Sequence, residues 1–182
     1  MAQPYSARSR DIEPFHVMAL LARANELQAA GHDVIHLEIG EPDFTTAAPI
    51  VEAGRAALAN GETRYTAARG LPALREAIAG FYQQRHGLNI DPQRILITPG
   101  GSGALLLASS LLVDPGKHWL LADPGYPCNR HFLRLVEGAA QLVPVGPQVR
   151  YQLTPELVAS HWNADSVGAL VASPANPTGT IL

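Results

Sequence analysis

The sequence predicts an α/β protein, a three-layer sandwich in which helices flank a mostly parallel sheet. From about Arg94 onward, short apolar segments alternate with segments of helical periodicity. The apolar segments lack polar alternation, which is typical of strands buried on both faces. The first ninety or so residues are mainly helical, and we expect them to pack around the sheet.

Composition narrows the classes of protein to which the chain can belong. Its 182 residues, 47% hydrophobic and 16% charged, are enough for a domain with a real core. A net charge of −3 and a single lysine, Lys117, argue against nucleic-acid binding. The lone cysteine, Cys128, cannot form a disulfide within the chain. No segment has the length of a membrane span and the N-terminus lacks a secretory core, so we expect a cytoplasmic protein without a membrane partner.

Apolar spacing and helix-ending glycines predict where the regular elements lie. Thr154 and Pro155 form a typical helix start, with the threonine as N-cap and the proline in the first turn. Helices are predicted at residues 15–30, 49–60, 71–86, 104–112, 129–137 and 154–162. Strands are predicted at residues 34–39, 94–98, 119–122, 141–145 and 168–172.

A glycine-rich segment, TPGGSGA at residues 98–104, lies between a predicted strand and an apolar helix. Glycines let the backbone approach a ligand closely, and a helix start offers free N–H groups to an anion. The segment lacks the spacing of dinucleotide and nucleotide phosphate loops. Taken alone, it is equally consistent with a phosphate cradle and with a tight turn that binds nothing.

Two further segments follow predicted strands, where ligands bind in open α/β sheets. In SPANPTG, the Asn176 side chain offers both a hydrogen-bond donor and an acceptor. A proline-rich surface turn that binds nothing would have the same sequence. In DPGYP, Tyr126 is placed to stack on a planar ligand, although a tyrosine covering the edge of the core is the better explanation of this segment taken alone.

The combination is more specific than its parts. In order, the chain carries GEPDF, YTAARGLPALREAIAGFY, TPGGSGALLL, DPGYP and SPANPTG. This order resembles the N-terminal portion of the class I/II, fold-type-I aminotransferases, which depend on pyridoxal 5′-phosphate. The resemblance covers essentially the whole chain, and the Asn-Pro-Thr-Gly element is among its most telling parts.

The resemblance implies how the cofactor would be held. Gly101, Ser102 and Gly103 would hold its phosphate, largely through backbone N–H groups. Tyr126 would stack on the pyridine ring, and Asn176 would hydrogen-bond the phenolic oxygen.

The resemblance also implies partners and domains. Tyr65 would reach the phosphate of a partner subunit across a homodimer interface, so that active sites are shared, and Gly40 would lie near the substrate carboxylate. Residues 1–45 would form an N-terminal arm and a small-domain segment. Residues 46–182 would be the first, incomplete part of the large cofactor-binding domain.

No catalytic residue is assigned within the chain. In the family the Schiff-base lysine follows the Asn-Pro-Thr-Gly element, and the sequence ends three residues after Gly179. Lys117 precedes a strand, at the wrong end to replace that lysine. We therefore expect the 182 residues to be inactive alone, and no metal site is expected from the histidine spacing.

The complete protein would move an amino group between an amino acid and a 2-oxo acid through pyridoxal phosphate. A lyase of the same fold that uses the same cofactor would share this N-terminal half. A non-catalytic, aminotransferase-like binding domain is the other alternative that the residues leave open.

Overall fold

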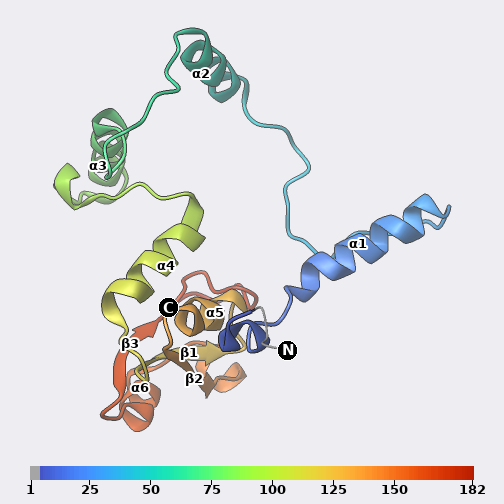
Figure 1. The fold of residues 1–182 in the computed structure, drawn as a ribbon, viewed down its shortest axis with the longest axis vertical. Helices are drawn as coiled ribbons and strands as arrows, with labels where there is room; N and C mark the ends of the chain where they lie inside the picture. The colour runs from blue at the N-terminus through green and yellow to red at the C-terminus, as the bar shows by residue number, and fades with distance from the viewer. Residues whose placement is uncertain (1–4) are drawn as a thin grey trace. The chain divides into compact units, whose positions relative to one another are not determined.

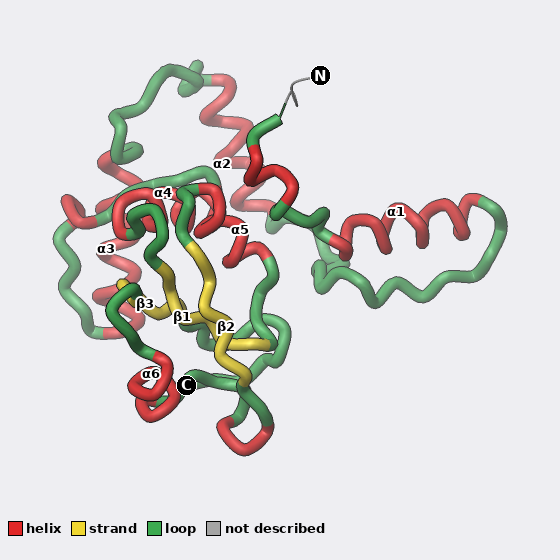
Figure 2. Tube along the Cα trace, turned by 60° about the horizontal axis from the view of Figure 1, so that its bottom comes forward, coloured by secondary structure: helices red, strands yellow, loops and turns green. Residues whose placement is uncertain are grey.

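The computed structural model describes residues 5–182 (Figures 1 and 2). Its contacts divide the chain into two compact units. One unit is Ile39–Gly100, and the other joins the residues up to Glu38 with Gly101–Leu182. The proposed division at residue 45, which concerns the complete protein, stays a prediction.

The second unit is built on a three-stranded parallel sheet, whose strands are β1 (His118–Asp123), β2 (Ala139–Pro144) and β3 (Ser166–Leu170). Their order is β2-β1-β3, and β1 pairs with a parallel neighbour on each side (Figure 2). Each strand lies within two residues of its predicted position, and the predicted parallel sheet is confirmed.

Helices cover both faces of this sheet, which gives the three predicted layers. Successive strand residues point to opposite faces, so Leu120 and Leu121 belong to different cores. On one face, α4 (Gly100–Leu112) and α5 (Cys128–Leu135) flank a core of Val113, Trp119, Leu121 and Leu133. On the other, α6 (Pro155–His161) packs on a core of Leu120, Val143, Val145 and Leu153.

The chain path explains why α5 and α6 lie on opposite faces. The connection from β1 to β2 through α5 moves outward to one edge, whereas the connection through α6 returns across β1 to β3 on the other edge. Parallel crossovers strongly favour one hand, so two crossovers in opposite directions place their helices on opposite faces.

An N-terminal arm, here residues 6–15, is joined to α5 and the turn after it by side-chain ion pairs. It contains a short 3-10 helix, η1 (Ala7–Arg10), and leads into α1 (His16–Ala29), which has no buried residue. The pairs are Arg8–Glu137 at 3.2 Å, Asp11–Arg134 at 2.7 Å and Glu13–Arg130 at 2.7 Å. Because their side chains are partly exposed, each pair contributes about 1 kcal/mol or less.

The unit Ile39–Gly100 contains α2 (Ala48–Ala59), α3 (Pro72–His86) and a 3-10 helix, η2 (Pro92–Arg94). The buried Arg75 ties α3 to η2, because its Nη1 donates to the Pro92 carbonyl at 3.0 Å. Gly70 has a φ of +88°, and a Cβ there would overlap the side chain of Ile97. Only glycine fits this close approach without strain.

Two predicted strands are wrong. Residues 34–39 and 94–98 are not strands, although Ile97 N–H donates to the Arg69 carbonyl at 3.1 Å. A strand needs a partner ladder for its backbone groups, and the described residues supply none at either place. An apolar run in the sequence does not identify a pairing partner, which is why both predictions failed.

Helix ends agree better with the sequence. Thr154 caps α6 by accepting from Leu157 N–H at 3.3 Å, as predicted. The glycine-rich segment differs, because α4 begins at Gly100 rather than at Ala104. Gly101, Ser102 and Gly103 therefore form the first helical turn and not a separate loop.

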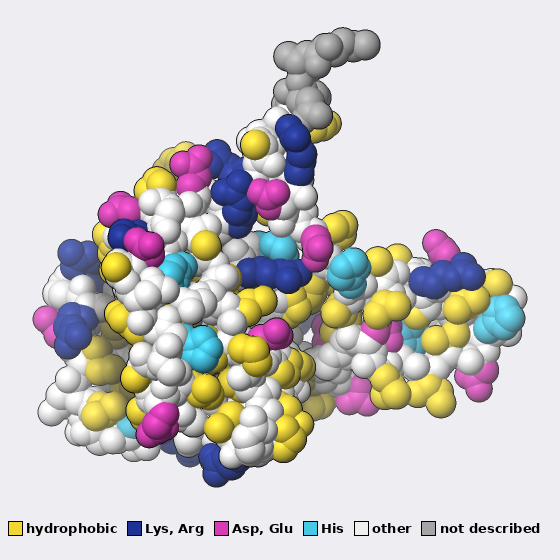
Figure 3. All heavy atoms as spheres, turned by 90° about the horizontal axis from the view of Figure 1, so that it is seen from below, with side chains coloured by type: hydrophobic (Ala, Val, Ile, Leu, Met, Phe, Trp, Pro, Cys, Tyr) yellow, Lys and Arg dark blue, Asp and Glu magenta, His cyan; other side chains and the backbone are white. Residues whose placement is uncertain are grey.

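Many large apolar side chains are exposed, as the yellow atoms on the face in Figure 3 illustrate. α2 has no buried residue, and α3 buries only Arg75. In residues 5–182, no helix combines the length and the apolar character needed to cross a bilayer.

The α5 core makes a testable prediction about stability. Leu133 is 1% exposed and Leu135, on the same helix, is 41% exposed. We expect Leu133→Ala to lower the free energy of unfolding by about 2–5 kcal/mol, because it leaves a cavity between α5 and the sheet. Leu135→Ala, the matched control, should cost less than about 1 kcal/mol. Urea unfolding followed by tryptophan fluorescence measures both, and equal losses would contradict this account of the core.

Candidate functional site

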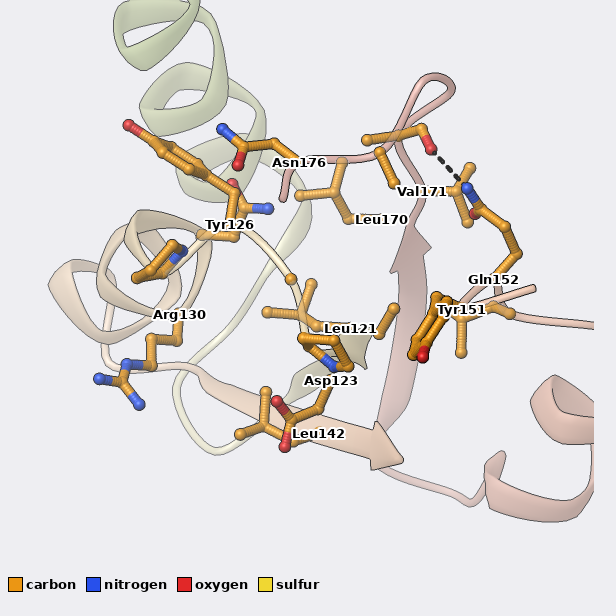
Figure 4. Close-up of a pocket in the computed structure, with 18 of the residues that line it drawn as sticks. Leu121, Asp123, Tyr126, Arg130, Leu142, Tyr151, Gln152, Leu170, Val171 and Asn176 are labelled. Atoms are coloured by element: carbon orange, nitrogen blue, oxygen red, sulfur yellow. Dashed lines mark hydrogen bonds between the residues drawn. The ribbon is translucent and has the colours of Figure 1, made fainter. Parts of the chain in front are cut away.

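A cavity of about 470 Å³ opens beyond the carboxyl ends of β1 and β3 (Figure 4). Its volume lies in the range of small-molecule sites, and its position is the one where open parallel sheets bind ligands. Most of its lining comes from residues 121–127, 151–153, 170–172 and 174–176. Two predicted site residues, Tyr126 and Asn176, are therefore brought to one cavity from segments about fifty residues apart.

Tyr126 lies between the end of β1 and the start of α5, and it is half-buried. The ring of Phe15, from the N-terminal arm, meets it edge-on with centroids 6.2 Å apart. The neighbouring Cys128 thiol, together with partial burial, raises the pKa of the Tyr126 hydroxyl. The phenol therefore stays neutral at physiological pH, and its ring is available as an apolar platform.

Asn176 lies in the loop that follows β3, which we call the Asn176 loop (residues 172–180). Two backbone bonds close the loop on itself, from Ala175 N–H to the Thr180 carbonyl and from Gly179 N–H to the Ala175 carbonyl, both at 2.8 Å. The Asn176 side chain is exposed at the cavity and lies beside Tyr126 in Figure 4. Its amide can thus offer a donor and an acceptor to a ligand over the ring of Tyr126.

The predicted phosphate-holding residues, Gly101, Ser102 and Gly103, occupy the first turn of α4. They do not line the cavity, but Leu105, on the same helix, does. The first N–H groups of a helix have no partner within it and favour an anion. A Cβ built on Gly101 meets nothing within 4 Å, so the space beside its backbone is open.

This set of residues fits pyridoxal phosphate on chemical grounds. An aromatic ring suits a planar heterocycle, an amide suits a polar ring substituent, and a helix start rich in glycine suits a phosphate. Tyr65 and Gly40 belong to the unit Ile39–Gly100 and are both exposed. Their roles remain predictions.

Lys117 lies before β1, at the end of the strand opposite the cavity. Its Nζ donates to Asp165 Oδ1 at 2.8 Å and to the Ala164 carbonyl at 3.2 Å. This ammonium group lowers the pKa of the Asp165 carboxyl. Lys117 therefore ties the loop before β3 to the start of β1. Within residues 5–182, no cluster of His, Cys, Asp and Glu has the geometry of a metal site.

Sequence reasoning missed Gln152, a polar side chain that lines the cavity while only 6% exposed. Its neighbours in the sequence, Tyr151 and Leu153, pack in the core beneath α6. A glutamine between two core residues, just before a capping threonine, is the one signal that the sequence offered. It also missed Phe15, whose contact with Tyr126 joins distant segments.

Comparison with known proteins agrees with this geometry. The family model described as "Aminotransferase class I and II" matches residues 32–182. A valine–pyruvate aminotransferase of Mycobacterium tuberculosis is 40% identical over 171 residues, which are 94% of this chain and 44% of that protein.

Solved structures show the same fold. A crystal structure of an aminotransferase from Mycobacterium tuberculosis superposes with a TM-score of 0.94 at 38% identity, covering 100% of this chain and 46% of that one. Aspartate aminotransferase from Thermus thermophilus with maleate gives a TM-score of 0.90 at 32% identity, covering 96% and 46% respectively.

The chain thus spans somewhat less than half the length of these relatives. The family model covers most of the chain, and two of the segments that carry the resemblance, DPGYP and SPANPTG, contribute residues to the cavity. The chain therefore belongs to the class I and II aminotransferases and corresponds to the N-terminal portion of these proteins.

Proposed function

We propose that the protein containing this chain is a pyridoxal-phosphate-dependent aminotransferase that exchanges an amino group between an amino acid and a 2-oxo acid. The family depends on this cofactor. The observation that carries the proposal is the meeting of Tyr126 and Asn176 at one cavity beyond the carboxyl ends of two parallel strands.

When bound, the cofactor supplies an electron sink for the substrate carbon that loses a proton. The residues of this chain bind and orient it. The ring of Tyr126 stacks on the cofactor ring and keeps water from that face. The Asn176 amide donates to the phenolic oxygen of the cofactor and so fixes the rotation of the ring in its plane.

The start of α4 holds the phosphate. Gly101, Ser102 and Gly103 present backbone N–H groups and the Ser102 hydroxyl at the positive end of a 13-residue helix. An anchor at the phosphate and a stacked ring at Tyr126 would together fix the place of the cofactor at the cavity. Gly40 approaches the substrate carboxylate through its backbone.

A homodimer completes the site in this proposal. Tyr65 is fully exposed, which is unusual for a large aromatic side chain. We assign it to the phosphate of the partner subunit, so that the two subunits share their active sites. The lysine that moves the proton would come from residues that follow the Asn-Pro-Thr-Gly element.

Determining the coding sequence after the Leu182 codon tests the proposal first. We expect an open frame that encodes a lysine-bearing remainder, and the expressed full-length protein should form a 2-oxo acid from an amino acid only when a second 2-oxo acid is present. Release of ammonia or loss of the substrate side chain would instead indicate a lyase. A stop codon at that point, with no second chain that supplies the lysine, would refute the proposal that the protein is an enzyme.

Replacing Tyr126 tests the stacking role in the full-length protein. Tyr126→Ala removes the ring, and we expect the cofactor dissociation constant to rise at least about fivefold, because a stacked pair contributes about 1 kcal/mol. Tyr126→Phe, the matched control, keeps the ring and should stay within about twofold of wild type. Fluorescence titration of the apoprotein measures both. Equal affinities for the alanine and phenylalanine variants would count against stacking.

Replacing Asn176 tests the hydrogen bond to the phenolic oxygen. A donor at that oxygen stabilises its deprotonated form, so removing the donor raises its pKa. We expect Asn176→Ala to move the pH midpoint of the absorbance change of the bound cofactor upward by about one unit, since a hydrogen bond to a charged group contributes about 1.5 kcal/mol or more. An unchanged midpoint would show that Asn176 does not donate a hydrogen bond to the phenolic oxygen.

A further inference from the structure

Gln152 is a buried polar residue that the proposed function does not use. Its side chain is inside the cavity wall, and its Nε2 lies within hydrogen-bond distance of three oxygen atoms. They are the Ala172 carbonyl at 3.2 Å, the Thr180 carbonyl at 2.9 Å and Thr180 Oγ1 at 3.2 Å. An amide carries two N–H groups, so it can donate to Ala172 and to Thr180 at the same time.

These acceptors are the two ends of the Asn176 loop. Ala172 lies where the chain leaves β3, and Thr180 lies where the loop returns. Asn176 is four residues from each end. A single amide group therefore holds both ends of the loop that carries the proposed cofactor ligand. Figure 4 shows Gln152 on the side of the cavity away from Tyr126, bonded to the chain that leaves β3.

The backbone on both sides of Gln152 is held by the core and by the turn that precedes it. Arg150 and Tyr151 have φ values of +51° and +56°, a left-handed conformation that non-glycine residues rarely adopt. Tyr151 and Leu153 pack against the core formed by Leu120, Val143 and Val145. The same turn makes a second contact with the returning chain, because Arg150 Nη2 donates to the Ile181 carbonyl.

Loss of the Gln152 donors has a defined physical cost. The carbonyls of Ala172 and Thr180 would lose a hydrogen-bond donor in a partly buried place, which is unfavourable. The backbone bonds within the Asn176 loop would remain, since they do not involve Gln152. The loop would thus keep its internal bonds but lose the side-chain bonds that hold its two ends to the turn before α6.

We propose that Gln152 is a positioning residue, which fixes the Asn176 loop so that the Asn176 amide meets the phenolic oxygen of the cofactor. The proposal rests on the function proposed above for Asn176. In this proposal Gln152 acts through the place and order of Asn176, because its Nε2 is engaged by the ends of the Asn176 loop.

Gln141 provides a matched control. It is also a partly buried glutamine whose Nε2 donates to a backbone carbonyl, that of His161, at 3.0 Å. It lies on β2 and contacts α6, and it makes no recorded bond with the Asn176 loop. Replacing either glutamine by methionine keeps the side-chain length and removes the donors, so a general loss of stability affects both variants.

The experiment compares the full-length wild type with Gln152→Met, Gln141→Met and Asn176→Ala, with pyridoxal phosphate as the probe. The first readout is the pH midpoint of the absorbance change of the bound cofactor, and the second is its dissociation constant. We expect Gln152→Met to raise the midpoint by about half a unit or more, in the direction of Asn176→Ala, and to weaken binding about threefold. Gln141→Met should leave the midpoint at the wild-type value.

The outcomes separate the two proposals. A wild-type protein that does not bind the cofactor overturns both. If Asn176→Ala shifts the midpoint but Gln152→Met behaves as Gln141→Met does, only the positioning role of Gln152 is overturned. If Gln152→Met does not fold, Thr180→Val, which removes one acceptor of the same bond set, replaces it. A smaller shift in the same direction then supports the proposal, and no shift refutes it.

Discussion

Parallel pairing of β1 on both its edges is the constraint on which the rest of this structure depends. It buries Leu120 and Leu121 on opposite faces, so each face needs its own helical cover. The connections that provide α5 and α6 must also return every strand in the same direction. All three strands therefore end at one edge, and the turns that follow β1 and β3 meet there around the cavity.

The two ends of the sheet consequently differ in how their polar side chains are paired. At the amino ends, polar groups are paired with each other: Lys117 with Asp165, and His118 Nε2 with Ser166 Oγ at 2.8 Å. At the carboxyl ends, the Asn176 side chain is exposed toward the cavity, and the buried Gln152 bonds to backbone rather than to a charged partner. Polar groups that are hydrogen-bonded to each other stabilise a fold, whereas polar groups that face a cavity can bind a ligand.

The sequence predicted features that depend on local pattern. Thr154 as a cap and the three sheet strands follow from residue type and apolar runs, and Tyr126 and Asn176 follow from motifs placed after strands. Features that depend on contacts between residues far apart in the chain were not predicted from the sequence. Nothing in the apolar run at residues 94–98 indicates that this segment has no neighbouring strand to pair with. Likewise, no sequence pattern predicts that Gln152 donates to the carbonyls of Ala172 and Thr180. Hydrogen-bond partners twenty or more residues apart are set by the tertiary fold, which periodicity does not encode.

In the proposed function, binding and proton transfer are separated along the sequence of the complete protein. The chain has one lysine, and the Lys117 ammonium group is held by Asp165 and Ala164 at the amino ends of the strands. It therefore cannot also serve the cavity at their carboxyl ends. The stacking ring, the amide and the helix start, by contrast, all lie within Gly101–Leu182. If this part orients the cofactor as proposed, without supplying the group that moves a proton, we expect changes at Tyr126, Asn176 or Gln152 to act first on cofactor affinity and on the pKa of its phenolic group, and on turnover only through them.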